Sequence, residues 1–145
     1  MLEVRFHDRV ADCQLKFAVI ASRSNGKWVF CKHKERTTYE FPGGHREKGE
    51  NIFDTAKREL YEEIGALDYS IKPICFYSVI GKNRVNETGE ETFGMLYYAD
   101  IKTFTQDLHS EMEKVVLMDG LPDNWTYPEI QPKLLERVLA GAQSF

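Results

Sequence analysis

The chain has 145 residues, a formal net charge of −4 and 42% hydrophobic residues. This length and composition predict one globular domain over residues 1–145, with a sizeable apolar core. The negative charge argues against broad, non-specific binding of nucleic acid, so no stable nucleic-acid partner is expected.

Cysteine usage and the first residues indicate a cytoplasmic protein. Cys13, Cys31 and Cys75 are scattered and form no CxxC pair, which favours reduced thiols over a zinc site or disulfides. Residues 1–9 are too charged for a secretory signal, and no apolar run is long enough to span a membrane. We expect no membrane partner, and either a monomer or a homodimer.

The first part of the chain predicts strands. Alternating apolar residues at 2–6 predict a short strand, and residues 15–21 form an apolar run of strand-forming residues. The sequence Ser24-Asn25-Gly26 predicts a hairpin turn that leads into a partner strand over residues 28–31. We expect these two strands to be central in a mixed sheet, with the aromatic side chains of the second strand in the core or on the sheet face.

An amphipathic helix is predicted between Asn51 and Gly65. Asn51 is a favourable N-cap, and Gly65 suits the left-handed residue that commonly ends a helix. Apolar residues recur between them at helical spacing, namely Phe53, Ala56, Leu60 and Ile64. Three carboxylates flank this predicted buried stripe, namely Glu59, Glu62 and Glu63.

Crowded carboxylates on one helix need a positive partner. Carboxylates three or four residues apart repel each other by roughly 0.2–0.5 kcal/mol per pair. Arg58 can pair with Glu62, but one arginine cannot neutralise three acids. Carboxylate oxygens suit Mg²⁺ or Mn²⁺, and magnesium sites commonly include substrate phosphates. The simpler alternative is a solvated helix face that forms salt bridges with Lys57 and Arg58.

The spacing of these residues resembles the Nudix box. The matching positions are Gly44, Glu50, Arg58, Glu59, Glu62, Glu63 and Gly65, with apolar residues after Glu59 and after Gly65. At about 7% usage per residue type, a chance match is on the order of one in a million. The departure is Ala66, where the family usually has a larger aliphatic residue. The resemblance implies an α+β fold, a three-layer α/β/α sandwich with a mixed central sheet, and hydrolysis of a diphosphate linkage.

The resemblance also implies roles for individual residues. It implies a Mg²⁺ site, in which Mn²⁺ can substitute, with these ligands: Glu59, Glu62, Glu63, the carbonyl of Gly43, and Glu111. The alternative for Glu111 is an acid on the surface without a ligand role. Glu50 would support the site, Arg58 would anchor the carboxylates by pairing, and Glu59 would be the general base.

Substrate contacts follow from the same resemblance. Lys32 and His33, at the end of a predicted strand, are expected to contact phosphates, although such a basic run is more commonly a solvated loop. Gly44 exposes backbone that a ligand can approach closely. Trp125 and Tyr127 are candidate walls for a purine.

The second half of the chain continues the pattern. Residues 69–80 have strand character on both sides of a proline, and residues 92–101 predict a returning strand. Residues 126–129 form a capping-box pattern ahead of a C-terminal helix. Pro132 offers two alternatives, a helix that begins near this proline or one that is kinked by it.

The substrate class is predicted less sharply than the family. Residues 40–44 resemble the segment that precedes the box in Nudix enzymes acting on oxidised purine nucleoside triphosphates. This favours hydrolysis of a nucleoside triphosphate, such as 8-oxo-dGTP, to a monophosphate and pyrophosphate. Ile130 stands where well-studied enzymes for oxidised guanine nucleotides use Asn, although Asn124 is close. The alternatives are ADP-ribose, dinucleoside polyphosphates, NADH or 5′-triphosphorylated RNA as substrate, or a non-catalytic nucleotide-binding regulatory module.

Overall fold

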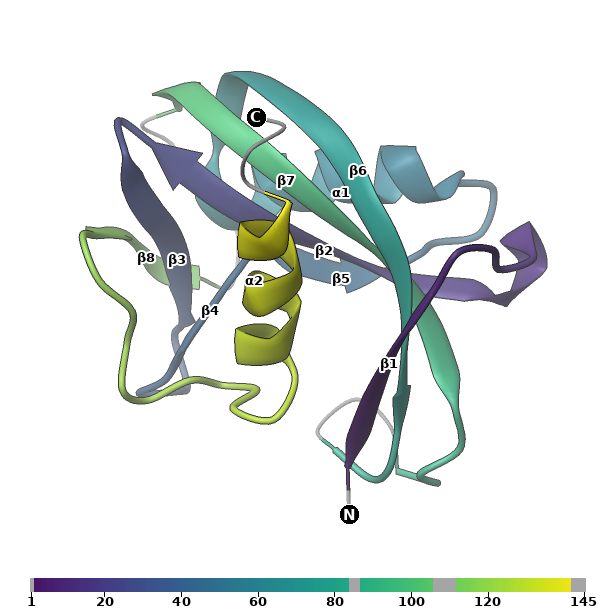
Figure 1. Ribbon diagram of the computed structural model, residues 1–145. Helices are drawn as coiled ribbons and strands as arrows, with labels where there is room; N and C mark the ends of the chain where they lie inside the picture. The colour runs from purple at the N-terminus through teal and green to yellow at the C-terminus, as the bar shows by residue number, and fades with distance from the viewer. Residues whose placement is uncertain (1, 84–86, 106–111, 142–145) are drawn as a thin grey trace.

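The computed structural model describes residues 2–83, 87–105 and 112–141, and its strands form one mixed sheet between two helices (Figure 1). The strands are β1 (Glu3–His7), β2 (Leu15–Ser24), β3 (Lys27–His33), β4 (Tyr39–Glu40), β5 (Gly43–His45), β6 (Ala66–Ile80), β7 (Thr92–Phe104) and β8 (Met112–Met118). The helices are α1 (Ile52–Ile64), α2 (Gln131–Ala140) and a short 3₁₀ turn at Asp12–Gln14.

The sheet order is β1-β6-β7-β2-β3-β4, with β5 also paired to β2 and β8 also paired to β3. The β2–β7 pair is parallel, and the other described pairs are antiparallel. Figure 1 shows α1 and α2 on opposite faces of this sheet. The structure therefore confirms the predicted three-layer α+β sandwich with a mixed central sheet.

The predicted hairpin joins two strands in the middle of the sheet. Asn25 has φ 51° and Gly26 has φ 76°, so both turn residues adopt the left-handed conformation that a two-residue hairpin requires. Successive residues of β3 point to opposite faces of the sheet. Val29 and Cys31 pack in the core below α1, whereas Trp28 and Phe30 pack in the core below α2. The aromatic side chains of this strand are buried, as predicted.

Helix α1 has the predicted ends but is rotated from the predicted stripe. The side chain of Asn51 accepts a hydrogen bond from the Asp54 amide at 2.8 Å, and Gly65 has φ 68°. Phe53 is 39% exposed, so the prediction that it belongs to the buried face is wrong. Thr55 and Glu59 are buried in its place. Because the buried arc is centred further round the helix, Glu59 lies inside it and not beside it.

Strand β6 continues through its proline. Pro73 pairs with Tyr97 in the register, and an irregularity follows between Pro73 and Cys75. A missing backbone N–H is tolerated beside such an irregularity. The two predicted strand stretches are therefore one long strand.

The predicted capping box ahead of α2 is wrong. Helix α2 begins at Gln131, its N-cap residue Ile130 makes no side-chain cap, and Pro132 lies in the first turn. The hydroxyl of Thr126 instead pairs with that of Thr38 at 2.7 Å. A first-turn proline loses no helical hydrogen bond, which explains why the helix can begin next to Pro132, the first of the two predicted alternatives.

Candidate active site

The glycine loop lies directly against α1. Strand β5 pairs with β2, with Gly43 opposite Val19 and Gly44 opposite Ala18. A Cβ added at Gly43 would lie 2.5 Å from the Ala18 carbonyl oxygen. One added at Gly44 would lie 2.7 Å from the carboxyl carbon of Glu59. Side chains are excluded at both positions, so the bare backbone can approach the Glu59 carboxylate closely.

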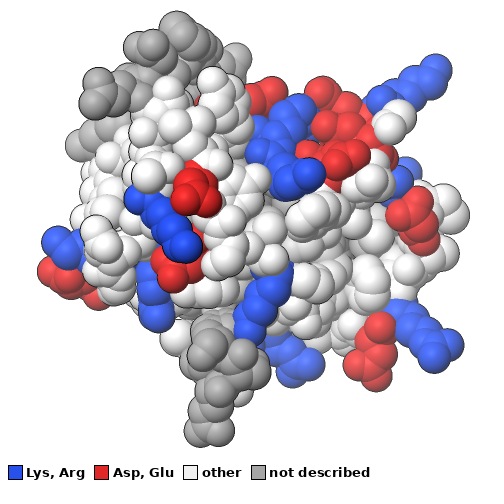
Figure 2. All heavy atoms as spheres, turned by 90° about the horizontal axis from the view of Figure 1, so that it is seen from above, with Lys and Arg blue, Asp and Glu red and all other residues white. Residues whose placement is uncertain are grey.

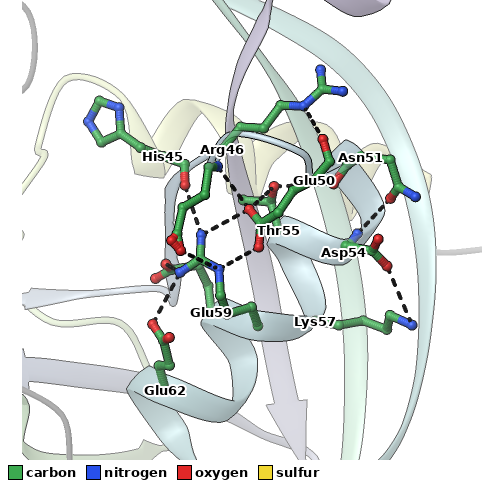
Figure 3. Close-up of polar contacts among 11 residues, drawn as sticks. His45, Arg46, Glu50, Asn51, Asp54, Thr55, Lys57, Glu59 and Glu62 are labelled. Carbon is green, nitrogen blue, oxygen red and sulfur yellow. Dashed lines mark hydrogen bonds and ion pairs between the residues drawn. The ribbon is translucent and has the colours of Figure 1, made fainter.

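Arg58 connects three of the box carboxylates. Its Nε donates to Glu50 Oε2 at 2.6 Å, and its Nη2 donates to Glu50 Oε1 at 3.1 Å. Its Nη1 donates to Glu59 Oε1 at 2.6 Å and to Glu62 Oε2 at 3.1 Å. Figure 3 shows Glu50, Glu59 and Glu62 directed toward this shared contact. The predicted Arg58–Glu62 pair is present, and a two-pronged contact with Glu50 accompanies it.

Glu50 is held in place from several sides. Its Oε1 accepts hydrogen bonds from the Thr55 hydroxyl and from the Glu47 amide, both at 2.9 Å. The hydrogen bond from Arg58 is the main cause that lowers the pKa of Glu50 to about 2. Glu50 is therefore ionised at neutral pH and orients the Arg58 guanidinium.

Glu59 and Glu63 carry carboxylates in surroundings that disfavour charge. Burial raises the pKa of Glu59 to about 7, although the neighbouring Arg58 acts in the opposite direction. Burial, and then the charge of Glu59, raise the pKa of Glu63 well above its usual range. The Gly43 amide donates to Glu63 Oε1 at 2.7 Å and partly offsets this effect. Near neutral pH these two groups need a proton or a cation.

The donor set fits a hard divalent cation. The carboxyl oxygens of Glu59, Glu62 and Glu63 lie on one side of α1, beside a loop that exposes backbone, and Arg58 pairs with the first two. Within the described ranges, no group of three His, Cys, Asp or Glu side chains is already arranged around a common point. Arg58 holds two of the carboxylates and the Gly43 amide holds the third. Glu111, the further predicted ligand, lies outside the described residues.

A cavity of about 90 Å³ opens beside the glycine loop. That space is several times what one water molecule needs. Its walls are mainly apolar and aromatic, and they come from β2, the β4–β5 segment, β6, β7 and the start of α2: Phe17, Ala18, Val19, Glu40, Phe41, Gly43, Gly44, His45, Tyr77, Val79, Asn83, Thr92, Tyr127, Ile130 and Gln131. Apolar walls with a few polar groups are typical of small-molecule sites.

The predicted substrate-binding residues are distributed unequally around this cavity. Gly44 and Tyr127 line it. Trp125 is half-buried and instead packs against Phe30, with ring centroids 5.4 Å apart, at the edge of the core below α2. Lys32 and His33 are half-buried residues at the end of β3 and do not line it.

Three polar residues near this site were not predicted from the sequence. Arg36 donates to the buried Glu40 carboxylate at 3.2 Å, and burial raises the pKa of Glu40. Gln131 accepts a hydrogen bond from the Phe41 amide at 2.8 Å. Arg36 and Glu40 are only four residues apart, whereas the Phe41–Gln131 contact joins residues 90 apart, so no local spacing could have indicated the Gln131 contact.

Charges of both signs share the surface. On the face shown in Figure 2, Lys and Arg side chains lie next to Asp and Glu side chains and do not form one continuous basic surface. Among the described residues, no helix has the length and apolar character needed to cross a membrane.

Comparison with known proteins defines the class of this site. The NUDIX domain model matches residues 14–131, and the chain belongs to the Nudix hydrolase family. It is thus a hydrolase that acts on phosphorus-containing anhydrides, in a family that acts on small nucleotide substrates and generally uses divalent metals.

Individual relatives support this assignment. A Bacillus subtilis protein named "Putative 8-oxo-dGTP diphosphatase YtkD" is 33% identical over 124 residues, which cover 85% of this chain and 74% of that protein. The crystal structure of the Bacillus subtilis pyrophosphohydrolase BsRppH superposes with a TM-score of 0.77 at 27% identity, covering 97% of this chain and 90% of that one. A C. elegans Ap4A hydrolase shares the fold, with a TM-score of 0.69 at 16% identity over 90% of this chain and 100% of that one.

Proposed function

We propose that the protein is a Mg²⁺-dependent enzyme that hydrolyses a nucleoside triphosphate to a nucleoside monophosphate and pyrophosphate. An oxidised purine nucleotide such as 8-oxo-dGTP is the candidate substrate. The main support is the glycine loop, whose backbone lies against the carboxyl groups of the buried Glu59 and the half-buried Glu63 and also lines the mainly apolar cavity. This arrangement suits a phosphate chain at the carboxylates and a base in the cavity. The name of the 33% identical Bacillus subtilis relative agrees with this substrate class.

In this proposal, Glu59, Glu62, Glu63, the Gly43 carbonyl and Glu111 hold Mg²⁺, and Mn²⁺ can substitute. When bound, the metal withdraws charge from the phosphoryl oxygens and lowers the pKa of a bound water. Glu59 deprotonates and orients the attacking water.

Other residues position these groups or bind the substrate. Glu50 orients the Arg58 guanidinium, which in turn fixes the positions of the Glu59 and Glu62 carboxylates. The backbone at Gly44 approaches the phosphate chain, and Tyr127 lies against the base. Lys32 and His33 contact phosphates, and Trp125 supports the wall of the cavity from the core below α2.

Chelation tests the metal requirement. EDTA is expected to abolish pyrophosphate release from nucleoside triphosphates, and added Mg²⁺ or Mn²⁺ to restore it. Hydrolysis that persists after thorough chelation would exclude the metal scheme.

A substrate panel tests the rest of the proposal. It should contain dGTP, 8-oxo-dGTP, ADP-ribose, diadenosine polyphosphates and 5′-triphosphorylated RNA, with products identified by mass. Faster turnover of a non-triphosphate substrate would overturn the proposed substrate class. Absence of hydrolysis across the panel would favour a regulatory nucleotide-binding module, although all box carboxylates are present.

A further inference from the structure

Gln131, the first residue of α2, is 97% buried (3% exposed) and lines the cavity. Its Oε1 accepts a hydrogen bond from the Phe41 amide at 2.8 Å. A backbone N–H can only donate, so this contact determines which end of the side-chain amide is the oxygen. The NH₂ group of Gln131 must therefore point the other way.

That NH₂ group has no partner among the residues that the structure describes. The contacts recorded for Gln131 are the one to Phe41 and the helical contact of its backbone N–H with the Tyr127 carbonyl. Arg23 Nε is the one described side-chain atom that is both fully buried and without a hydrogen-bond partner. Gln131 Nε2 is thus unpaired but not fully enclosed, on a residue that lines the cavity. A donor in such a place gains a partner when a ligand enters.

The walls around this donor are mainly apolar, and the polar side chains among them include the Glu40 carboxylate. Phe17, Val79 and Ile130 give apolar surface, and Tyr77 adds an aromatic ring. Such walls favour a flat base without selecting one, because apolar contact is non-directional. A fixed donor among them selects the chemistry of the edge that faces it.

We propose that Gln131 selects the nucleobase, by donating a hydrogen bond from Nε2 to an oxo group on the edge of a purine. This inference rests on the proposed function. An oxo group accepts the hydrogen bond, whereas an amino group at the same place sets two donors against each other. The oxo group can be at C6, as in guanine, or at C8, as in an oxidised purine. Gln131 is in this sense a specificity-determining residue, separate from the carboxylates of α1.

Four triphosphates separate the two sources of the oxo group. These are dATP with neither oxo group, 8-oxo-dATP with the C8 oxo, dGTP with the C6 oxo, and 8-oxo-dGTP with both. The wild-type enzyme is expected to show a higher kcat/KM for at least one oxo purine than for dATP, by about tenfold or more. A higher kcat/KM for dGTP than for dATP would place the contact of Gln131 at C6, and a higher kcat/KM for 8-oxo-dATP than for dATP would place it at C8. Equal kcat/KM for all four substrates would overturn the proposal.

The substitution Gln131→Glu gives the matched test. It retains an oxygen for the Phe41 amide but removes the Nε2 donor. The ratio of kcat/KM between the preferred oxo purine and dATP is expected to fall by about tenfold or more, measured at a pH where the new carboxyl is ionised. A fall that is equal for all four substrates would show that Gln131 acts only through Phe41, and would overturn the proposal. If Gln131→Glu does not fold, the same kcat/KM ratio is measured in Gln131→Met, which also lacks the donor and is expected to show the same fall.

Binding of monophosphates without metal separates this inference from the proposed function. In EDTA, wild-type protein is expected to bind GMP or 8-oxo-dGMP more tightly than AMP, and Gln131→Met to lose this difference. If no triphosphate is hydrolysed but this difference is present, the proposed function fails and the role of Gln131 stands. If triphosphates are hydrolysed but neither the binding difference nor the rate ratio depends on Gln131, the role of Gln131 fails and the proposed function stands.

Discussion

The two helices of this protein are both amphipathic and pack on opposite faces of one sheet, yet they bury different chemistry. Helix α2 buries Leu134, Leu135 and Val138 along most of its inner face. Helix α1 buries Ala56 and Leu60, but also the carboxyl-bearing Glu59. An amphipathic pattern therefore predicts that a helix packs on a sheet, and not what its buried face does.

The difference has an energetic consequence. Burial of apolar side chains in α2 stabilises the fold, at roughly 25 cal/mol per Å² of apolar surface removed from water. Burial of carboxylates in α1 opposes folding unless they are paired or protonated. Arg58 pairs with Glu50, Glu59 and Glu62, whereas Glu63 relies on the Gly43 amide. The face of α1 next to the glycine loop thus carries carboxylates, and this lowers the free energy of unfolding relative to an apolar face.

The largest expected effect comes from removing a carboxylate of α1. Glu63→Gln or Glu62→Gln is expected to lower kcat by at least about 10²-fold, because a main electrostatic contribution is lost. Glu136→Gln on α2, which removes an exposed carboxylate, is the matched control and should retain activity. Circular dichroism checks that each variant is folded. Unchanged turnover in the α1 variants would remove these residues from the mechanism.

A substitution in α2 should show the opposite behaviour. Leu134 is 1% exposed, so Leu134→Ala is expected to lower the free energy of unfolding by roughly 3 kcal/mol through a cavity. The kcat of the folded fraction should change little, because Leu134 does not line the site cavity. Urea denaturation with parallel activity assays measures both quantities. A loss of kcat comparable to that of Glu63→Gln would show that the two helices are not functionally distinct.

The contact between the glycine loop and α1 can be tested at Gly44. A Cβ there would lie 2.7–2.9 Å from the Glu59 carboxyl group, so Gly44→Ala must displace that side chain. Overpacking of this kind costs about 1–3 kcal/mol. We expect reduced kcat and a lower melting temperature. Gly26→Ala is the control for stability alone, since nothing lies within 4 Å of a Cβ at Gly26 and its strain comes from φ 76°. Wild-type activity in Gly44→Ala would contradict the close approach.

The smallest expected effect is a pH dependence that belongs to α1. In the metal-free protein the pKa of Glu59 is raised from 4.5 to about 7. The folded state then binds more protons than the unfolded state between these values. The contribution to stability is fully present below about pH 4.5 and is lost as pH rises through about 7. The raised pKa of Glu63 acts in the same direction.

Melting temperatures in EDTA should therefore fall from about pH 5 to about pH 8, and Glu59→Gln should weaken this fall. Added Mg²⁺ should raise the melting temperature more at the higher pH, because binding requires ionised carboxylates. Glu50 does not contribute here, since its pKa is lowered to about 2 and its effect is lost only in strong acid. A flat profile, equal for wild type and Glu59→Gln, would disprove the assigned burial of Glu59.

Local chemistry explains which features could be predicted. The cap at Asn51, the left-handed Gly65 and the Asn25-Gly26 turn depend on a few neighbouring residues, and all three are present as expected. The apparent capping box at residues 126–129 failed because its threonine has a partner in another segment, Thr38. A local pattern is reliable only while no distant residue competes for the same group.

The site shows the same division. Spacing alone indicated three carboxylates crowded on α1, and their contacts with Arg58 and the Gly43 amide show them on one side of the helix. It did not indicate the rotation that buries Glu59 in place of Phe53, nor the packing of Trp125 against the core below α2. Both depend on how the helix or loop docks on the sheet.

The sequence by itself determined the family, the sandwich, the ends of α1 and the crowd of carboxylates on it, because these follow from residue types at fixed spacing. The tertiary structure alone decided how deeply Glu59 and Glu63 are buried, and which side chains surround the cavity. It also placed Gln131 against the Phe41 amide, 90 residues away in the chain. Burial and long-range hydrogen bonds depend on which surfaces meet when the layers pack, and no local stretch of sequence contains that information.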